Sequence, residues 1–230
     1  MGVAVRQMFA AIAEHYDQLN SLLSFGLHHR WRWQAVRWSG VQPGAQVLDL
    51  CSGTADLALA FRRYLRGAGQ VIATDFCPAM LVRGVRKAAK QRALLVFALA
   101  DAQCLPFGDA SFDCVSVAFG LRNVECLATA LREMHRVLRP GGVALVLEFG
   151  QPQGALFGSL YRWYARHIMP RLGAWVSGHD EAYTYLPRTA AAFPAGPRFV
   201  REMTAQAFID VQARPLTGGV VYLYTATRPV

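Results

Sequence analysis

The stretch "QVLDLCSGTADL", residues 46–57, decides the fold that this sequence predicts. It begins as a short apolar run typical of a buried strand, and Asp49 closes that run. Gly53 then allows close backbone approach at a turn, after which apolar residues recur at helical spacing. A strand that passes through a glycine turn into a helix begins a βαβ unit, so a parallel sheet is expected.

The residues that follow repeat this alternation. Apolar runs typical of strands lie at residues 46–51, 70–75, 94–101, 112–120 and 143–149. Helical spacing covers residues 54–66, 78–92 and 125–138, where "RPGG" stops the last helix. The tail has two more strand patterns joined by "TGG", which predict a terminal antiparallel hairpin. The pattern therefore predicts an α/β, Rossmann-like fold with a mostly parallel seven-stranded sheet and helices on both faces.

Composition narrows the class of protein. Hydrophobic residues make up 53% of the chain, which excludes a disordered protein, and no apolar run is long enough to span a bilayer. The net charge of +9 suits nucleic acid, an anionic membrane face or an acidic substrate. Five cysteines without metal-ligand spacing, and no secretory signal, favour a reduced, cytosolic compartment. We interpret all five as small core or near-core residues.

Ligands of an open parallel sheet bind where the strands end. The second strand delivers Asp75, the third delivers Asp101 and Ala102, and the fourth delivers Arg122 and Asn123. Taken singly, Asp75 could equally be a helix N-cap, and Asp101 could simply shape a turn. Together with Asp49 and Gly53, the acidic strand ends predict a nucleoside pocket.

The glycine turn also indicates which nucleoside is bound. It has one glycine where a dinucleotide fingerprint needs three, and the chain has no P-loop lysine. We therefore expect a nucleoside without a pyrophosphate, such as S-adenosylmethionine.

Several longer stretches make the chain resemble class I S-adenosylmethionine methyltransferases, and within them the ubiquinone/menaquinone biosynthesis C-methyltransferases of the UbiE/MenG type. The resemblance runs almost end to end. The most particular stretches are "YDQLNSLLSFGLHHRWR", "FGLRNV" and "YTYLPRTAAAFP".

The resemblance implies a role for ten residues. Cofactor contacts are implied for Thr54, Asp75, Asp101 and Ala102, with Asp49 and Gly53 in the same first-strand turn. Substrate-facing roles are implied for Tyr16, Arg122 and Asn123. Ala118 stands where many members carry a serine that touches the cofactor.

The chain also departs from the family pattern in the glycine turn and near the C-terminus. Ala55 replaces a usual glycine, and its methyl group fits if its φ is negative. Ala207 replaces another usual glycine, which we interpret as a packing change.

The implied function is methylation of a ring carbon of a prenylated quinol, with demethylmenaquinol favoured as the substrate. The alternatives are the corresponding ubiquinone precursor, another lipid or small molecule, or a non-catalytic fold-mate in a quinone-biosynthesis complex. Arg122 would stabilise the developing oxyanion without a metal, and Asn123 and Tyr16 would orient the ring. A structural ion pair for Arg122 and a helix cap for Asn123 are the alternatives. The proton acceptor is left open between a bound water and Asp101.

The flanks suggest where the enzyme works. Basic aromatic stretches such as "HHRWRWQAVRW" favour interfacial or lid helices at an anionic membrane. Plain core packing is the second alternative. Binding of nucleic acid is the third, and we do not expect nucleic acid as a partner. We expect a single domain, 1–230, peripheral to the inner face of the cell membrane, with a homodimer left open. Its parts are a helical lid (1–40), a cofactor-binding core (41–150), a substrate- or membrane-facing helical insertion (151–200) and the hairpin (201–230). The histidines are interpreted as surface or packing residues, although His15 could line the pocket.

Overall fold

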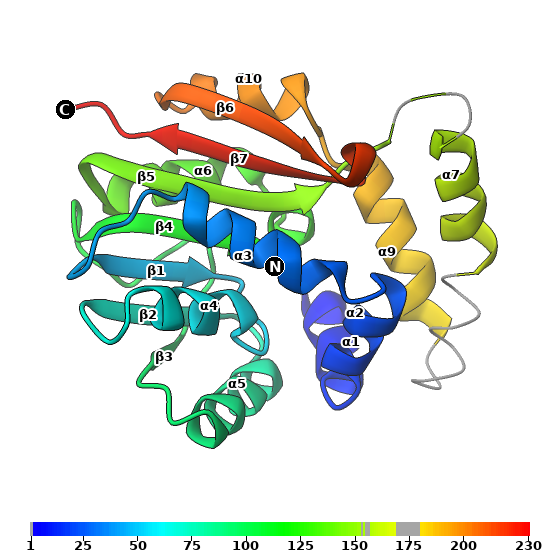
Figure 1. Cartoon of the computed structure of the whole chain (residues 1–230), viewed down its shortest axis with the longest axis horizontal. Helices are drawn as coiled ribbons and strands as arrows, with labels where there is room; N and C mark the ends of the chain where they lie inside the picture. Colours follow the sequence, from blue (N-terminus) through cyan, green and yellow to red (C-terminus); the bar gives the residue numbers. More distant parts are fainter. Residues whose placement is uncertain (1, 153, 155–156, 169–179) are drawn as a thin grey trace.

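Seven strands form one sheet in the order β3-β2-β1-β4-β5-β7-β6. The computed structural model describes residues 2–152, 154, 157–168 and 180–230 (Figure 1). The strands are β1 (Gln46–Leu50), β2 (Gln70–Asp75), β3 (Val96–Leu99), β4 (Phe112–Ala118), β5 (Leu138–Phe149), β6 (Ile209–Leu216) and β7 (Val221–Thr227). The first five are parallel, and β7 runs antiparallel to both β5 and β6. The predicted mixed sheet and terminal hairpin are thereby confirmed.

Helices cover both faces of this sheet. The N-terminal helices are α1 (Val3–Ile12), α2 (Tyr16–Leu23) and α3 (Leu27–Trp38). The helices between strands are α4 (Asp56–Tyr64), α5 (Pro78–Lys90) and α6 (Leu127–Val137). After β5 follow α7 (Phe157–His167), α9 (Asp180–Ala192) and α10 (Pro197–Ala205). Short 3-10 turns lie at η1 (Leu121–Asn123) and η2 (Thr217–Gly219). The four-part division of the chain stays a prediction.

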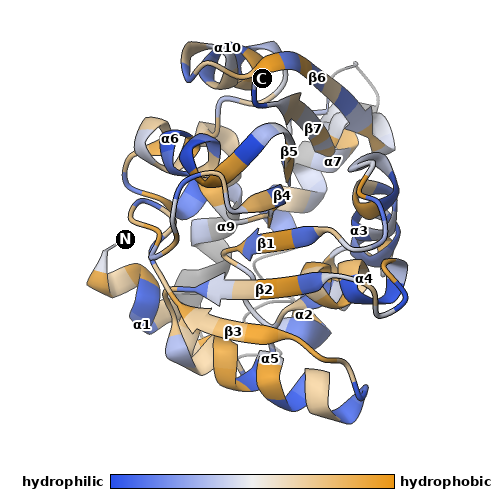
Figure 2. Cartoon of the chain, turned by 90° about the vertical axis from the view of Figure 1, so that its left-hand side faces the viewer, coloured by the Kyte–Doolittle hydropathy of each residue, from blue (hydrophilic) through white to orange (hydrophobic). Residues whose placement is uncertain are grey.

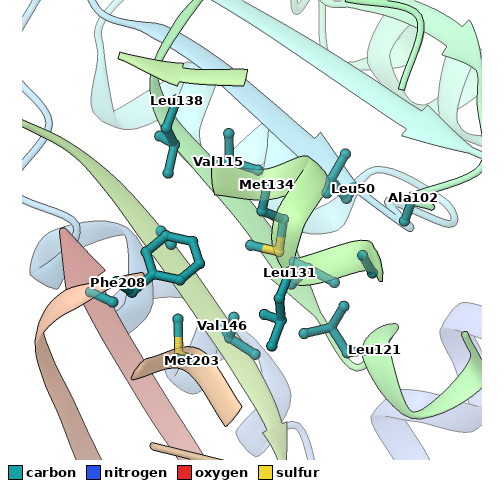
Figure 3. Close-up of a cluster of buried hydrophobic side chains, with 14 of the residues drawn as sticks. Leu50, Ala102, Val115, Leu121, Leu131, Met134, Leu138, Val146, Met203 and Phe208 are labelled. Atoms are coloured by element: carbon teal, nitrogen blue, oxygen red, sulfur yellow. The ribbon is translucent and has the colours of Figure 1, made fainter. Parts of the chain in front are cut away.

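The core divides into two layers because side chains of a strand alternate between the faces of a sheet. Leu48 and Leu50 of β1 belong to the cluster that α6 and α10 cover, with Met134 and Phe208 (Figure 3). Val47 belongs to the cluster on the opposite face, which α3 and α4 cover. Apolar strands with both faces covered are what a buried parallel sheet requires, and Figure 2 shows β1 to β3 as largely hydrophobic ribbons side by side.

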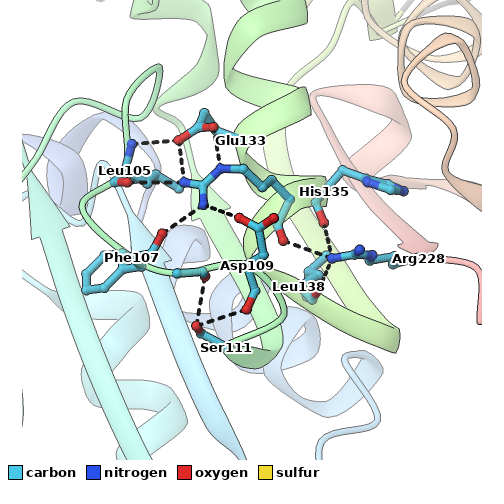
Figure 4. A network of polar contacts seen from close by, with 10 residues as sticks. Leu105, Phe107, Asp109, Ser111, Glu133, His135, Leu138 and Arg228 are labelled. Atoms are coloured by element: carbon cyan, nitrogen blue, oxygen red, sulfur yellow. Dashed lines mark hydrogen bonds and ion pairs between the residues drawn. The ribbon is translucent and has the colours of Figure 1, made fainter.

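The passage from α6 to β5 differs from the prediction. The helix ends at Val137, one residue before its predicted end. The next residues, "RPGG" included, already belong to β5, which starts five residues earlier than the predicted strand. The register between β4 and β5 shifts here, between Phe112 and Cys114. The guanidinium of Arg228 donates to the carbonyls of His135, Arg136 and Leu138, which satisfies backbone groups that the helix end leaves open (Figure 4).

The cysteine prediction is correct in part. Cys77 and Cys114 are buried and Cys51 is half-buried, but Cys104 and Cys126 are exposed. All five are free thiols. Cys126 is exposed because it is the N-cap residue of α6, at the surface end of the helix. No helix within the described ranges is long and apolar enough to cross a bilayer.

Candidate active site

The turn after β1 lies at the edge of the sheet where the parallel strands end. Gly53 has φ of +55°, and its N–H donates to Oδ2 of Asp75 at 2.8 Å. Ala55 has φ of +66° and is fully buried, so the condition for an unstrained alanine, a negative φ, is not met. Left-handed backbone at a non-glycine residue costs free energy and persists where surrounding structure enforces it.

Asp75 connects two strand ends through its carboxylate. Oδ1 accepts the N–H of Cys77 at 2.8 Å while Oδ2 accepts that of Gly53. The N-cap of α5 is Cys77, so the interpretation of Asp75 as the N-cap is wrong. Its carboxylate instead joins the turn after β1 to the end of β2. Burial raises the pKa of Asp75 to about 6, against the lowering effect of these backbone donors.

Asp49 is buried beneath the same turn. Its Oδ1 accepts the hydroxyl of Ser116 on β4 at 2.7 Å. Its Oδ2, like Oγ of Ser52, is buried without a hydrogen-bond partner among the described residues. Unsatisfied buried oxygens are rare in proteins and indicate a place where a ligand or water completes the contacts. With the close-approach glycine, these two oxygens could accept hydrogen bonds from the amino and hydroxyl groups of S-adenosylmethionine.

Burial raises the pKa of Asp49 to about 7, although Ser116 and Arg32 oppose the shift. Since the folded protein holds this proton more tightly than the unfolded chain, stability should fall as pH rises from about 4 to about 7. The variant Asp49→Asn should lack this loss, which amounts to at most about 4 kcal/mol. Urea unfolding of both proteins at the two ends of the window measures it. The exposed Asp210→Asn is the control, and an equal pH dependence in wild type and Asp49→Asn would contradict the assignment.

Asp101 shapes a turn after β3, which was one of the two interpretations of this residue in the sequence. Its Oδ1 accepts the N–H of Gln103 at 2.9 Å, and a bridge joins it to Cys104. Burial raises the pKa of Asp101, but lowering interactions, with the backbone hydrogen bond from Gln103 first among them, leave the pKa below its usual value. Ala102 is buried in the main core. Ala118 ends β4 and is half-buried beside the core layer of α3 and α4.

Gly120 leaves β4 next to the β1 turn. Its φ is −111°, so the chain needs no special freedom here. It needs space, because an added Cβ would lie 2.3 Å from Cβ of Cys51. We expect Gly120→Ala to destabilise the protein by about 1–3 kcal/mol through overpacking. Urea unfolding checks this, and Gly108→Ala is the control because its nearest neighbour would be 3.6 Å away. Equal midpoints for the two variants would disprove the steric reading.

An apolar cavity of about 100 Å³ lies beside these strand ends. Its walls come from α1, α2, α3, α7 and α9, from the residues after β4, from the last residue of β5 and from the residue before β7. The polar groups among its lining residues are Tyr16, Asn20, Ser24, His28, Arg32, Arg122, Tyr161 and Tyr185. A mostly apolar enclosure with a few convergent polar groups is typical of a site for an apolar ring compound.

Arg122 lines the cavity from the 3-10 turn after β4. Nη1 pairs with Oε1 of the fully buried Glu148 at 3.0 Å and also donates to the carbonyl of Phe119. The Nε–H is buried and has no acceptor within the described part of the chain. The ion-pair interpretation of Arg122 is therefore correct in geometry, and the Nε–H is left without an acceptor from the described residues.

Of the two further residues expected to face the substrate, the structure brings Tyr16 to the cavity but not Asn123. Asn123 is not a lining residue; its Oδ1 accepts the hydroxyl of Tyr185 at 3.0 Å, and Tyr185 lines the cavity. Nor does Asn123 cap α6, because the N-cap is Cys126. Tyr16 does line the cavity, with its ring edge-on to Phe9. An added Cβ on Gly53 would lie 3.8 Å from Cε1 of Tyr16, so this ring joins the cavity to the β1 turn.

The hydroxyl of Thr54 contacts helices α2 and α5. It donates to Oδ1 of Asp17 at 2.6 Å and accepts from Lys87 at 2.9 Å. Lys87 also pairs with Asp17 at 2.5 Å and Asp56 at 2.8 Å. These bonds fasten α2 to the turn after β1, so the contact of Thr54 with a cofactor stays a prediction.

His28 is a buried lining residue of the cavity, which corrects its reading as a surface or packing residue. His15, in contrast, is half-buried and does not line the cavity. Sequence patterns missed His28 because its helix face is set only by tertiary packing. The sequence could have predicted the role of Glu148, because a carboxylate inside the apolar run 143–149 requires a buried partner.

The sheet order, the antiparallel β7 and the acidic strand ends define a class I S-adenosylmethionine-dependent methyltransferase. The solved structure of a SAM-dependent methyltransferase from Thermotoga maritima shares this fold, with a TM-score of 0.63, 16% identity and coverage of 96% of this chain and 99% of that one. The model of the ubiE/COQ5 methyltransferase family matches residues 2–228, and the chain belongs to that family.

Two relatives agree with this membership. The ubiquinone/menaquinone biosynthesis C-methyltransferase UbiE of Bdellovibrio bacteriovorus is 44% identical, over 97% of this chain and 95% of that protein. The demethylmenaquinone methyltransferase of Thermus thermophilus is 44% identical, over 96% of this chain and 100% of that protein.

Proposed function

We propose that the protein transfers the methyl group of S-adenosylmethionine to a ring carbon of a prenylated quinol, with demethylmenaquinol as the substrate. The observation that carries this is the apolar cavity, which brings an arginine with a free buried Nε–H next to the strand ends of a methyltransferase fold. The names of the relatives support quinone C-methylation and include both quinone types.

The residues of the chain account for the steps other than methyl donation, which the sulfonium supplies when bound. Aromatic and aliphatic walls exclude water and hold the ring in line with the donor. The Nε–H of Arg122 donates to the ring oxygen as it gains negative charge. Glu148 balances the charge of Arg122, so stabilisation of the oxygen comes from a directed hydrogen bond rather than from a free cation. The hydroxyl of Tyr185 gives its proton to Asn123, so its oxygen can accept a hydrogen bond from a second ring hydroxyl.

Quinone profiling by mass spectrometry in a deletion strain tests the reaction and the substrate. Accumulated demethylmenaquinone, relieved by the wild-type gene, is the expected result. A demethylated benzoquinone would instead select the ubiquinone precursor. An unchanged quinone profile would overturn the proposed function.

We further propose that the protein works at the cytoplasmic face of the membrane, where its substrate is dissolved. An apolar rim beside the cavity supports this: Leu22, Phe25, Leu160 and Trp163 are 39%, 73%, 61% and 53% exposed. Phe25 contacts Tyr164 of α7 at 5.8 Å between ring centroids, which joins the two parts of the rim. Exposed arginines lie close to these residues in the chain, Arg30 in α3 and Arg166 in α7, and they suit an anionic surface.

Flotation with anionic liposomes tests membrane binding. The double variant Phe25→Ser/Trp163→Ser should lose most binding because interfacial affinity scales with buried apolar area. Leu94→Ser is the control, since Leu94 is 78% exposed just before β3 and outside the rim. Equal loss in the control would contradict a localised rim. A homodimer stays a prediction that sedimentation would measure.

A further inference from the structure

The methyl transfer requires a proton acceptor. One positive charge leaves when the sulfonium becomes a thioether, and one proton must leave the quinol. Among the titratable side chains that line the cavity, an arginine has no acceptor atom and a tyrosine hydroxyl already carries its proton. Burial raises the pKa of Tyr161 to about 12, for example. His28 is the remaining candidate among the described lining residues.

The hydrogen bonds around His28 determine its tautomer. Oγ of Ser24 lies 2.6 Å from the carbonyl oxygen of Asn20, which can only accept, so the single hydroxyl proton is used there. Oγ of Ser24 is also 2.7 Å from Nδ1 of His28. Since the hydroxyl has no second proton, Nδ1–H must be the donor of this bond. The neutral imidazole therefore has its lone pair on Nε2, which no hydrogen bond from the described residues engages.

The surroundings keep this imidazole neutral. Burial, Arg32 and His29 lower the pKa of His28 to about 4, while Asp56 and Asp17 oppose the shift more weakly. At neutral pH the lone pair is thus available. A weak base is sufficient, because a hydroxyl becomes strongly acidic as its ring gives electrons to the methyl group.

We propose that His28 is the catalytic base of this reaction and that its Nε2 accepts the proton of the quinol hydroxyl beside the methylated carbon. The inference rests on the proposed function. The electron pair of the O–H bond moves into the ring, the ring carbon forms the new C–C bond, and the pair of the S–CH3 bond stays on sulfur. The imidazolium then returns its proton to the ring oxygen as the ring proton leaves to water and aromaticity is restored. Ser24 is a positioning residue, since it acts by fixing the tautomer.

Kinetics of His28→Asn test the base directly. Asparagine can still donate to Ser24 from its amide nitrogen but has no basic nitrogen, so kcat should fall about 100-fold or more while KM changes little. The control His15→Asn, in the same N-terminal region but outside the cavity, should stay within about twofold of wild type. Added imidazole should restore part of the activity of His28→Ala, whereas pyrrole, which has no basic nitrogen, should not.

A measurement without turnover tests the tautomer. NMR of protein labelled with ¹⁵N in its histidine rings should show His28 protonated at Nδ1 and bare at Nε2, unchanged from about pH 6 to about pH 8. Ser24→Thr should keep this pattern and most of kcat, and Ser24→Ala should lose both.

The outcomes separate the two proposals. An active wild type with an equally active His28→Asn, or a proton found on Nε2, overturns the role of His28 and leaves the proposed function standing. A wild type that methylates no prenylated quinol overturns the proposed function itself.

Discussion

Arg122→Lys should lose methyl transfer while it keeps its fold and its cofactor. Lysine can maintain the charge pair with Glu148, but it has no second, fixed donor in the place of Nε–H. Loss of one donor to a developing oxyanion typically lowers kcat by about 10²–10³-fold. Turnover of the reduced quinol measures the loss, and calorimetric titration of S-adenosylmethionine should show affinity within about threefold of wild type.

The control for this substitution is Arg139→Lys. Arg139 pairs with Asp113 at 2.6 Å, but their side chains are 45% and 37% exposed and lie outside the cavity lining. Its activity should be unchanged. An Arg122→Lys variant with wild-type kcat would show that Arg122 is only a structural ion pair.

Glu148→Ala should give the largest loss of stability. Glu148 is fully buried and accepts from the guanidinium of Arg122 and from the backbone N–H groups of Arg122 and Phe149. Its removal leaves the Arg122 charge, 6% exposed, without a counter-ion. Breaking a buried pair in this way costs about 3–5 kcal/mol, measurable as the free energy of unfolding in urea.

The matched control is Glu14→Ala. Glu14 pairs with Arg83 at 2.9 Å, but its side chain is 71% exposed, so this variant should lose at most about 1 kcal/mol. Glu148→Gln should fall between the two, because the amide keeps a neutral acceptor for Phe149. A loss as small as that of Glu14→Ala would show that water compensates the charge of Arg122.

Much of the sheet could be predicted because its signals are local. Runs such as residues 70–75 are apolar throughout, and their alternation with helical spacing leaves few arrangements besides a covered parallel sheet. Because parallel strands end at one edge, the sequence also places Asp49, Asp75 and Asp101 near one another. The start of β5 was less predictable, because pairing with β4, rather than local preference, makes "RPGG" part of a strand.

The roles of polar side chains depended on partners distant in sequence. Asn123 is 62 residues from Tyr185, and Arg122 is 26 residues from Glu148. No local pattern shows that these pairs meet, or that His28 is turned into the cavity wall rather than toward solvent. The sequence was sufficient for the class of fold and the edge that binds ligands, since burial and chain direction impose both. The tertiary packing of the N-terminal helices decided which groups face the quinol, because donors, acceptors and the histidine tautomer are set by contacts between segments.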